Sequence, residues 1–226
     1  MINKARITEM FTSIQGEGLY VGERQLFIRF HGCNLSCRFC DEKRKEKDAF
    51  SEYEASELIK EIIISGKRNI SLTGGEPLLQ ADFLKEMLPA LKKEGKRIYL
   101  ETNGILTAGL LKILKYVDII SMDFKLPSST GLKPYWDEHA VFLKEAAGKE
   151  VFVKSVIMPQ TLLSDINTAA SIIEKVNKNI PFIIQPASHD RGLEKIDLLP
   201  VFFEGAREKL PNVRIIPQMH KFLGVK

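Results

Sequence analysis

All three cysteines of this 226-residue chain lie within eight residues, as Cys33, Cys37 and Cys40. The C-x3-C-x2-C spacing places three thiols on one short loop, and thiolates are soft ligands that suit iron-sulfur clusters, zinc or copper(I). A closed site with four ligands needs one more donor. An open iron-sulfur cluster on three thiolates is the favoured interpretation. Three ordinary buried cysteines, or a structural zinc site completed by His31, are the alternatives.

Four further groups of polar residues are expected where predicted strands end. They are residues 73–77 (TGGEP), 101–104 (ETNG), 121–125 (SMDFK) and 185–186 (QP). In parallel sheets and barrels, ligand sites lie at the carboxyl ends of the strands. We therefore expect the four groups to meet at one mouth, together with the cysteine loop.

The elements that must position these residues alternate between short apolar strands and helices. Strands are expected at 6–11, 25–30, 69–73, 97–101, 118–123, 150–157, 182–185 and 213–216. Helices are expected at 83–93, 108–115, 136–146, 165–177 and 198–209, and a first one is expected after a capping-box pattern of Ser51 and Glu54. This alternation predicts an α/β fold with a parallel sheet and outer helices, as an open sheet or as a partial or full barrel. No linker, repeat or low-complexity tract interrupts it, so we expect one domain over residues 1–226.

The composition narrows the class of protein. A hydrophobic content of 44% is enough for a sizeable core, and the net charge of +4 is too small to indicate nucleic-acid binding. The sequence shows no signal-peptide pattern and no apolar run of membrane-spanning length. A cytoplasmic protein is expected, and clustered thiols in a reducing compartment are typical of metal or redox sites.

The segment Thr73-Gly74-Gly75-Glu76-Pro77 has two interpretations. It is a tight turn that starts a helix, or a place where side-chain-free glycines let the backbone approach a ligand while Glu76 accepts hydrogen bonds from an ammonium group. No Walker A pattern and no G-x-G-x-x-G accompanies it, which disfavours nucleoside triphosphatases and dinucleotide enzymes.

The cysteine loop, with Phe39 before its last cysteine, and the later Gly-Gly-Glu-Pro turn together resemble the radical S-adenosylmethionine (SAM) superfamily. Within it, residues 11–18, 27–29, 32–35, 40–41 and 213–220 are similar to the 7-carboxy-7-deazaguanine synthase family, which serves queuosine and archaeosine precursor synthesis. The resemblance extends over almost the whole chain. It implies a partial (β/α) barrel of the radical SAM type.

The resemblance also implies a [4Fe-4S] cluster on Cys33, Cys37 and Cys40, with one iron left open for the amino and carboxylate groups of SAM. Such enzymes cleave SAM to a 5'-deoxyadenosyl radical. In this family the radical takes a hydrogen atom from 6-carboxy-5,6,7,8-tetrahydropterin, the ring contracts, ammonia leaves and the cofactor is regenerated. This is a carbon-nitrogen lyase reaction.

Site residues follow from the resemblance by position. Those implied to contact SAM are Phe39, Cys40, Asp41, Gly74, Gly75, Glu76, Ser121, Asp123, Lys125 and Gln185. Those implied to contact the substrate are Ile14, Gln15, Gly16, Glu17, Arg29, Thr73 and His220. Arg29 is expected to meet the substrate carboxylate in a bidentate contact. His31 is expected to be structural, and His139 and His189 have no assigned role.

Glu42 is where the chain departs from the family. A hydroxyl residue that ligates Mg²⁺ commonly follows the Cys-Asp pair, and glutamate stands there instead. Its carboxylate is a hard oxygen ligand that suits Mg²⁺, but it adds a negative charge near the substrate carboxylate. Three alternatives are therefore open at Glu42: tighter magnesium binding, no magnesium binding, or a different contact with the substrate.

Two other functions compete with this one. An enzyme that generates a glycyl radical on a partner protein shares the cysteine loop and the turn, but does not need the segment 14–17. A zinc-stabilised nucleic-acid-binding module predicts a basic stripe, which the sequence does not show. For the favoured function, the expected partners are a small pterin substrate, a flavodoxin or ferredoxin as electron donor, and a second copy of the chain in a homodimer, with no nucleic acid and no membrane.

Overall fold

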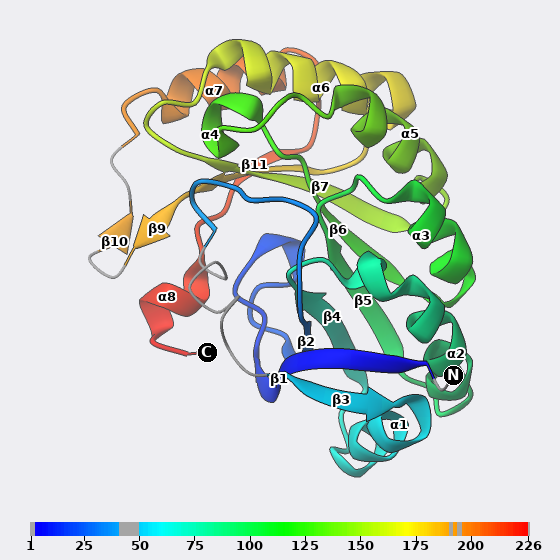
Figure 1. The fold of residues 1–226 in the computed structure, drawn as a ribbon. Helices are drawn as coiled ribbons and strands as arrows, with labels where there is room; N and C mark the ends of the chain where they lie inside the picture. The colour runs from blue at the N-terminus through cyan, green and yellow to red at the C-terminus, as the bar shows by residue number, and fades with distance from the viewer. Residues whose placement is uncertain (1–2, 41–49, 190–191, 194–195, 226) are drawn as a thin grey trace.

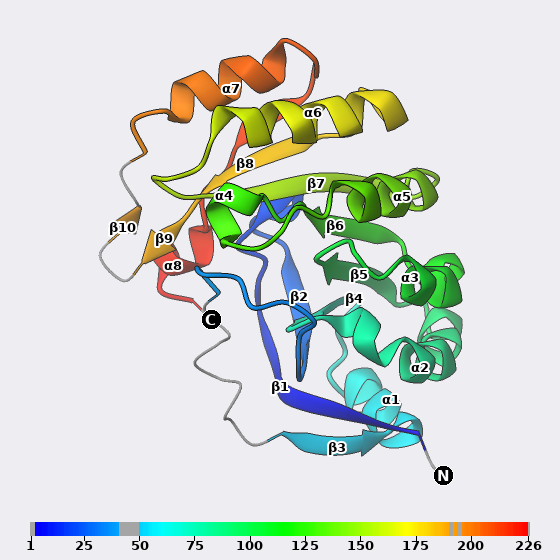
Figure 2. The same ribbon diagram turned by 45° about the horizontal axis from the view of Figure 1, so that its top comes forward.

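The computed structural model describes residues 3–40, 50–189, 192–193 and 196–225. Its centre is a curved nine-stranded sheet with the order β11-β8-β7-β6-β5-β4-β2-β1-β3 (Figures 1 and 2). The strands from β11 to β2 run parallel to one another, and β1 pairs antiparallel with both β2 and β3. Among the described residues β11 and β3 form the two ends of the sheet. The barrel is therefore partial, and the predicted parallel α/β architecture is confirmed.

Apart from β3, the strands of this sheet lie close to their expected positions. They are β1 (Lys4–Ile14), β2 (Arg24–Phe30), β3 (Ser51–Glu54), β4 (Asn69–Gly74), β5 (Arg97–Thr102), β6 (Ile119–Asp123), β7 (Glu150–Ile157), β8 (Phe182–Pro186) and β11 (Val213–Ile215). A separate short hairpin joins β9 (Ser188–His189) to β10 (Gly192–Leu193). The sequence did not indicate β3 or the hairpin.

The main helices pack along the outer face of the sheet (Figures 1 and 2). They are α1 (Ala55–Ile64), α2 (Ala81–Lys93), α3 (Thr107–Ile113), α5 (Trp136–Ala146), α6 (Leu163–Asn177) and α7 (Leu199–Arg207). Two short helices, α4 (Pro127–Thr130) and α8 (Met219–Leu223), lie near the carboxyl ends of the strands. Among the described residues, none of the helices combines the length and the apolar character that a membrane span requires.

The start of α1 differs from the expected capping box. Ser51 pairs with Ile7 in the edge strand β3, so it is not available to begin a helix. Glu54 is the N-cap instead, and it exchanges hydrogen bonds with Glu57 three residues later. The capping box thus begins three residues later than the Ser51/Glu54 pattern predicts. The S-x-x-E spacing lies in the strand β3, directly before the helix.

The inner face of the sheet changes from apolar to polar along the four neighbouring strands β5 to β8. Side chains alternate between the two faces of a strand, so residues two apart share a face. Tyr99, Ile119, Phe152 and Ile183 form an apolar cluster on the inner face, separate from the main core under the helices. The residues two positions further along these strands are Glu101, Ser121, Lys154 and Gln185. Polar groups are thus brought together at the carboxyl ends of the strands.

Candidate active site

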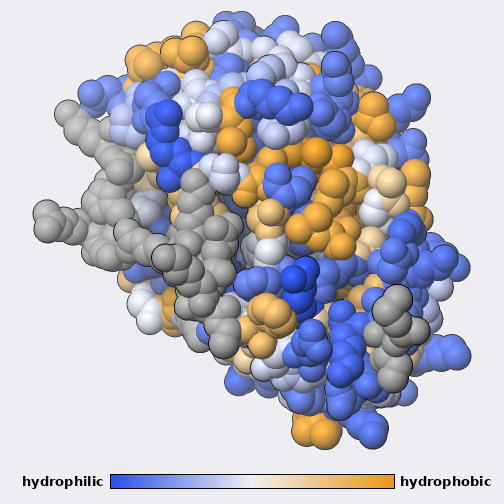
Figure 3. Space-filling view, in the orientation of Figure 1, coloured by the Kyte–Doolittle hydropathy of each residue, from blue (hydrophilic) through white to orange (hydrophobic). Residues whose placement is uncertain are grey.

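A cavity of about 420 Å³ opens at the carboxyl ends of the strands. This volume is in the range that small-molecule sites commonly have. It is lined by the cysteine loop, the glycine turn, the segment 14–17 and the C-terminal segment. Figure 3 shows this face of the molecule, with apolar side chains gathered over the segments between α4, α5 and α3 and hydrophilic ones around them. The expected convergence of the strand ends on one mouth is therefore observed.

The three cysteines and Phe39 all line this cavity. Burial raises the pKa of the Cys33 and Cys37 thiols above the ordinary value. The backbone N–H of Arg38 donates to the Thr130 carbonyl at 2.9 Å, which fixes the loop to α4. Among the described residues no three acidic, histidine or cysteine side chains are arranged to hold a single metal ion. A [4Fe-4S] cluster does not need such convergence, because each thiolate binds a different iron.

The glycine turn brings the end of β4 against the cysteine loop. Gly75 N–H donates to Phe30 O at 3.0 Å, and Glu76 N–H donates to Gly32 O at 2.9 Å. Gly74 has φ of +121°, a conformation that residues with a Cβ rarely adopt. A Cβ on Gly75 would overlap the carbonyl oxygen of Gly32. The two glycines are therefore required for close backbone contact with the loop that carries the cysteines.

Glu76 is fully buried beneath this turn and does not line the cavity. Its Oε1 accepts from Leu78 N–H at 3.0 Å and from the Thr102 hydroxyl at 2.9 Å, and its Oε2 accepts from Asn103 N–H at 2.8 Å. Burial raises its pKa to about 7 despite these donors. In this structure Glu76 therefore connects the turn to the end of β5. Ser121, on β6, is likewise buried without lining the cavity.

His139 supports the same region from behind. Its Nε2 lies 3.1 Å from the carbonyl oxygen of Asn103, and its ring stacks on Phe124 with centroids 4.6 Å apart. Burial lowers its pKa to about 4, so the ring is neutral at neutral pH and Nε2 is the donor in this contact. The sequence offered no role for His139, since its partners are 36 and 15 residues away.

The lowered pKa of His139 predicts a loss of stability in mild acid. In the unfolded chain His139 binds a proton near pH 6.5, whereas in the folded chain it binds one only near pH 4. Its neutral form therefore contributes fully to the free energy of unfolding above about pH 6.5, and this contribution is lost as the pH falls toward 4. This difference corresponds to about 2 kcal/mol lost between pH 7.5 and pH 5. Urea unfolding at both pH values measures it. His139→Gln, which does not titrate, should lose about 2 kcal/mol less over this interval, and equal losses in the two proteins would contradict the assignment.

The segment 14–17 and Arg29 also line the cavity. Gln15 is 3% exposed, and its amide donates to Glu101 Oε1 at 2.8 Å while its carbonyl accepts from Glu17 N–H at 3.0 Å. The Thr73 hydroxyl donates to Glu101 Oε2 at 2.7 Å. Arg29 lies 3.4 Å from Glu9 and over the ring of Phe11. These contacts hold the residues expected to bind the substrate at the cavity wall.

The C-terminal segment fastens this wall. Met219 N–H donates to Gly16 O at 2.8 Å, and the Gln218 amide donates to Glu17 Oε1 at 2.7 Å. The His220 ring packs so closely on Gly16 that a Cβ there would overlap it. His220 lines the cavity. The structure thus brings His220 to the residues with which the resemblance grouped it.

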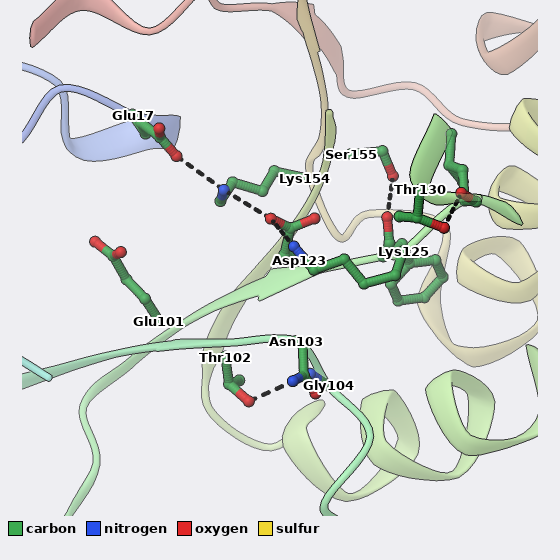
Figure 4. Close-up of polar contacts among 12 residues, drawn as sticks. Glu17, Glu101, Thr102, Asn103, Gly104, Asp123, Lys125, Thr130, Lys154 and Ser155 are labelled. Carbon is green, nitrogen blue, oxygen red and sulfur yellow. Dashed lines mark hydrogen bonds and ion pairs between the residues drawn. The ribbon is translucent and has the colours of Figure 1, made fainter. Parts of the chain in front are cut away.

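Alternating charges cross the floor of the cavity (Figure 4). Lys154 Nζ donates to Glu17 Oε2 at 2.8 Å and to Asp123 Oδ2 at 2.9 Å, and Lys125 Nζ lies 2.8 Å from the same Asp123 oxygen. Burial opposes ionisation of both carboxyl groups, but the lysines outweigh it and hold the pKa values of Glu17 and Asp123 below the ordinary range. The residues of the cavity floor therefore carry full charges at neutral pH.

Two buried side chains at the cavity have polar atoms with no hydrogen-bond partner among the described residues. They are Asp123, through Oδ1, and Gln185, through both atoms of its amide. Buried polar groups are normally satisfied, so these atoms indicate a bound ligand. The open thiols, the side-chain-free glycines and these acceptors and donors fit an iron-sulfur cluster with SAM. Asp41 and Glu42 lie outside the described residues.

Two charged residues of this site were given no role from the sequence, although Glu101 lies in the group 101–104 that was expected at the mouth. Glu101 accepts hydrogen bonds from Gln15 and Thr73, and Lys154 joins Glu17 to Asp123. Each is the charged residue on the inner face of an otherwise apolar strand centre, at Tyr99-Leu100-Glu101 and Phe152-Val153-Lys154. A charge in such a position is costly unless it is paired. This pattern was the signal in the sequence that could have identified Glu101 and Lys154 as residues of the site.

Comparisons with known proteins agree with this geometry. The family model of the radical SAM superfamily matches residues 27–158, which is more than half of the chain. The 7-carboxy-7-deazaguanine synthase of Geobacter sulfurreducens is 38% identical, over 97% of each chain. That of Methanothermobacter thermautotrophicus is 34% identical, over 100% of each chain.

Solved structures show the same fold. QueE from Escherichia coli superposes with a TM-score of 0.67 at 21% identity, over 96% of this chain and 95% of that one. TYW1 with a lysine-pyruvate adduct has a TM-score of 0.60 at 16% identity, over 82% and 74%. Neither the glycyl-radical activating enzyme nor the zinc-stabilised nucleic-acid module finds support in these matches. By its sequence and its fold, the chain belongs to the 7-carboxy-7-deazaguanine synthase family of the radical SAM superfamily.

Proposed function

We propose that the protein converts 6-carboxy-5,6,7,8-tetrahydropterin to 7-carboxy-7-deazaguanine with loss of ammonia, a step of queuosine precursor biosynthesis. One observation carries this proposal beyond family membership. A single cavity joins three open thiols to the segment 14–17, and both sides hold residues that the family resemblance assigns to ligands. A radical reaction requires the cofactor and the substrate to lie side by side, because the reacting atoms must be in contact.

Cys33, Cys37 and Cys40 would hold the [4Fe-4S] cluster, with Phe39 and Asp41 beside it. The SAM contacts that we propose are Gly74, Gly75, Asp123, Lys125 and Gln185, which line the cavity. Glu76 and Ser121, which the resemblance also implies, are buried outside its lining. When bound, the cluster and SAM supply the hydrogen-atom abstraction. The protein positions the two molecules. The unpartnered atoms of Asp123 and Gln185 support this part of the proposal.

The substrate would lie against the part of the cavity that the segment 14–17 lines. Gln15, Gly16 and Glu17 offer amide, backbone and carboxylate groups to the donor and acceptor edge of the pterin, with Ile14, Thr73 and His220 around it. Glu17 remains ionised there, because the charge of Lys154 outweighs the effect of burial on its pKa. Arg29 would receive the substrate carboxylate, since a guanidinium binds a carboxylate through two parallel hydrogen bonds.

Three further parts of the proposal rest on the resemblance. The enzyme would receive electrons from a flavodoxin or ferredoxin, work as a homodimer and reside in the cytoplasm. Mg²⁺ would bind at Glu42, beside the substrate carboxylate. Replacing Glu42 by threonine, the hydroxyl residue typical of the family, should change the Mg²⁺ concentration that gives half-maximal activity. An unchanged Mg²⁺ response would exclude Glu42 as a ligand.

The proposed reaction is tested with protein reconstituted anaerobically with iron and sulfide. It is incubated with a chemical reductant, SAM and 6-carboxytetrahydropterin, and the products are identified by mass spectrometry and an ammonia assay. We expect 7-carboxy-7-deazaguanine and one ammonia for each molecule of it. Formation of 5'-deoxyadenosine without the deazaguanine would retain the radical SAM chemistry and exclude the proposed substrate.

A further inference from the structure

Lys154 is a buried cation on the inner face of β7. Its neighbours on this face are Phe152 and Val156, and the residue is 7% exposed. Its Nζ donates to Glu17 and to Asp123, at 2.8 and 2.9 Å. Figure 4 shows the ammonium group between these two carboxylates. No assignment from the sequence or from the family resemblance gives Lys154 a role.

Packing alone does not explain a lysine at this position. Removing a charge from water is costly, and a buried ion pair is often no more stabilising than apolar side chains of similar volume. Glu17 and Asp123 together compensate the charge of Lys154 and raise its pKa well above the ordinary value, against the effect of burial. An ammonium with two fixed partners is, however, well suited to hold those partners in place.

The two partners belong to different halves of the site. Glu17 lies in the segment that we propose for the substrate, and it is 137 residues from Lys154 in the sequence. Asp123 ends the strand that we propose for SAM, and its Oδ1 is buried without a partner among the described residues. We infer that Lys154 is a positioning residue through which the binding of SAM and the binding of the pterin substrate strengthen one another. This inference rests on the proposed function.

The two ligands would be coupled because each orders one partner of the same ammonium group, that of Lys154. A ligand that occupies Oδ1 of Asp123 fixes the orientation of this carboxylate, and hence of the ammonium bound to Oδ2. The ammonium in turn fixes Glu17, whose other oxygen is held by Gln218. The second ligand then meets a side chain that is already ordered, so its binding costs less entropy. Couplings between sites are commonly 5-fold to 150-fold in affinity, and they are reciprocal.

The test measures binding rather than turnover. Holoenzyme is reconstituted but not reduced, so no reaction occurs. The dissociation constant of 6-carboxytetrahydropterin is measured anaerobically by calorimetry with and without saturating SAM. For the wild-type protein we expect SAM to tighten pterin binding by at least about fivefold. For Lys154→Met we expect the ratio to fall to about one, and for Lys154→Arg, which keeps the charge, to lie between the two.

Lys96→Met is the matched control. Lys96 is a second buried lysine, 9% exposed, whose Nζ donates to the Lys67 carbonyl at 2.7 Å. It precedes β5, at the end of the sheet opposite the cavity. Its replacement removes a buried charge without touching the site. We expect a loss of stability and an unchanged SAM effect on pterin binding.

Lys154→Met leaves the carboxylate of Glu17 without the ammonium that neutralises it, and this cost can prevent folding. The double variant Lys154→Met/Glu17→Gln removes that problem, because Asp123 keeps Lys125 and position 17 becomes neutral. Loss of coupling in whichever of the two variants folds supports the inference. A folded variant that keeps the wild-type ratio, or a wild-type protein without coupling, would overturn it while leaving the proposed function intact. A wild-type protein that binds no pterin would overturn the proposed function itself.

Discussion

We expect Cys37→Ala to abolish cluster formation and to reduce product formation by at least about 10³-fold, since the cofactor carries the difficult chemistry. Cys37 is the buried member of the three, and the other two thiols cannot replace it because each binds its own iron. The variant should remain colourless after reconstitution with iron and sulfide. Iron and sulfide analysis and the visible spectrum measure this, alongside the assay for 7-carboxy-7-deazaguanine.

Ser36→Ala is the control for the cysteine replacement. Ser36 is exposed on the same loop and is not among the residues that line the cavity. We expect this variant to bind the cluster and to remain active. A Cys37→Ala protein with full iron, sulfide and activity would contradict the cluster assignment. A wild-type protein that is colourless and binds zinc instead would favour the structural zinc site.

The second large effect is expected for Gly75→Ala. The added methyl group would overlap Gly32 O and lie 3.0 Å from Cys33 N, and both are backbone atoms of the loop that carries the cysteines. Backbone atoms cannot move away from an added methyl group as easily as the end of a flexible side chain can. We expect the free energy of unfolding to fall by about 3 kcal/mol, the upper part of the range for overpacking. We also expect a lower iron content after reconstitution, because the loop must move to relieve the overlap.

Gly148→Ala provides the comparison for Gly75→Ala. Gly148 does not have positive φ, and a Cβ there would meet no atom within 4 Å. Its effect on the urea midpoint should correspond to less than about 1 kcal/mol. Equal midpoints and equal iron contents for the two variants would show that the glycine turn does not support the cysteine loop.

Sequence patterns predicted the parallel sheet and its outer helices because these patterns are local and strong. The periods of the strands β4 to β8 and of the helices α2, α3, α5, α6 and α7 repeat over many residues, so the boundaries differ from the expected ones by only a few residues. The short helix α4 was not expected. β3 was missed because it is a four-residue edge strand, Ser51–Glu54, in which Tyr53 is the only hydrophobic side chain and no apolar alternation is present. Its pairing with β1 decides its conformation.

The candidate site was predicted where motifs are contiguous and missed where pairing is distant. The cysteine loop and the glycine turn are short motifs, and each is found at the cavity. The partners of Glu17, by contrast, lie 137 and 201 residues away, at Lys154 and Gln218. Local patterns contain no information on which side chains meet across a sheet. Only the fold reveals that these groups form one charged floor.

The most direct test of the proposed function is the number of product molecules formed for each SAM consumed. Because the cofactor is expected to be regenerated, we predict that reduced holoenzyme makes many molecules of 7-carboxy-7-deazaguanine for each 5'-deoxyadenosine released. Quantitative chromatography of both compounds during turnover of 6-carboxytetrahydropterin gives this ratio. A ratio of one would contradict regeneration of the cofactor, and 5'-deoxyadenosine without any 7-carboxy-7-deazaguanine would contradict the proposed function.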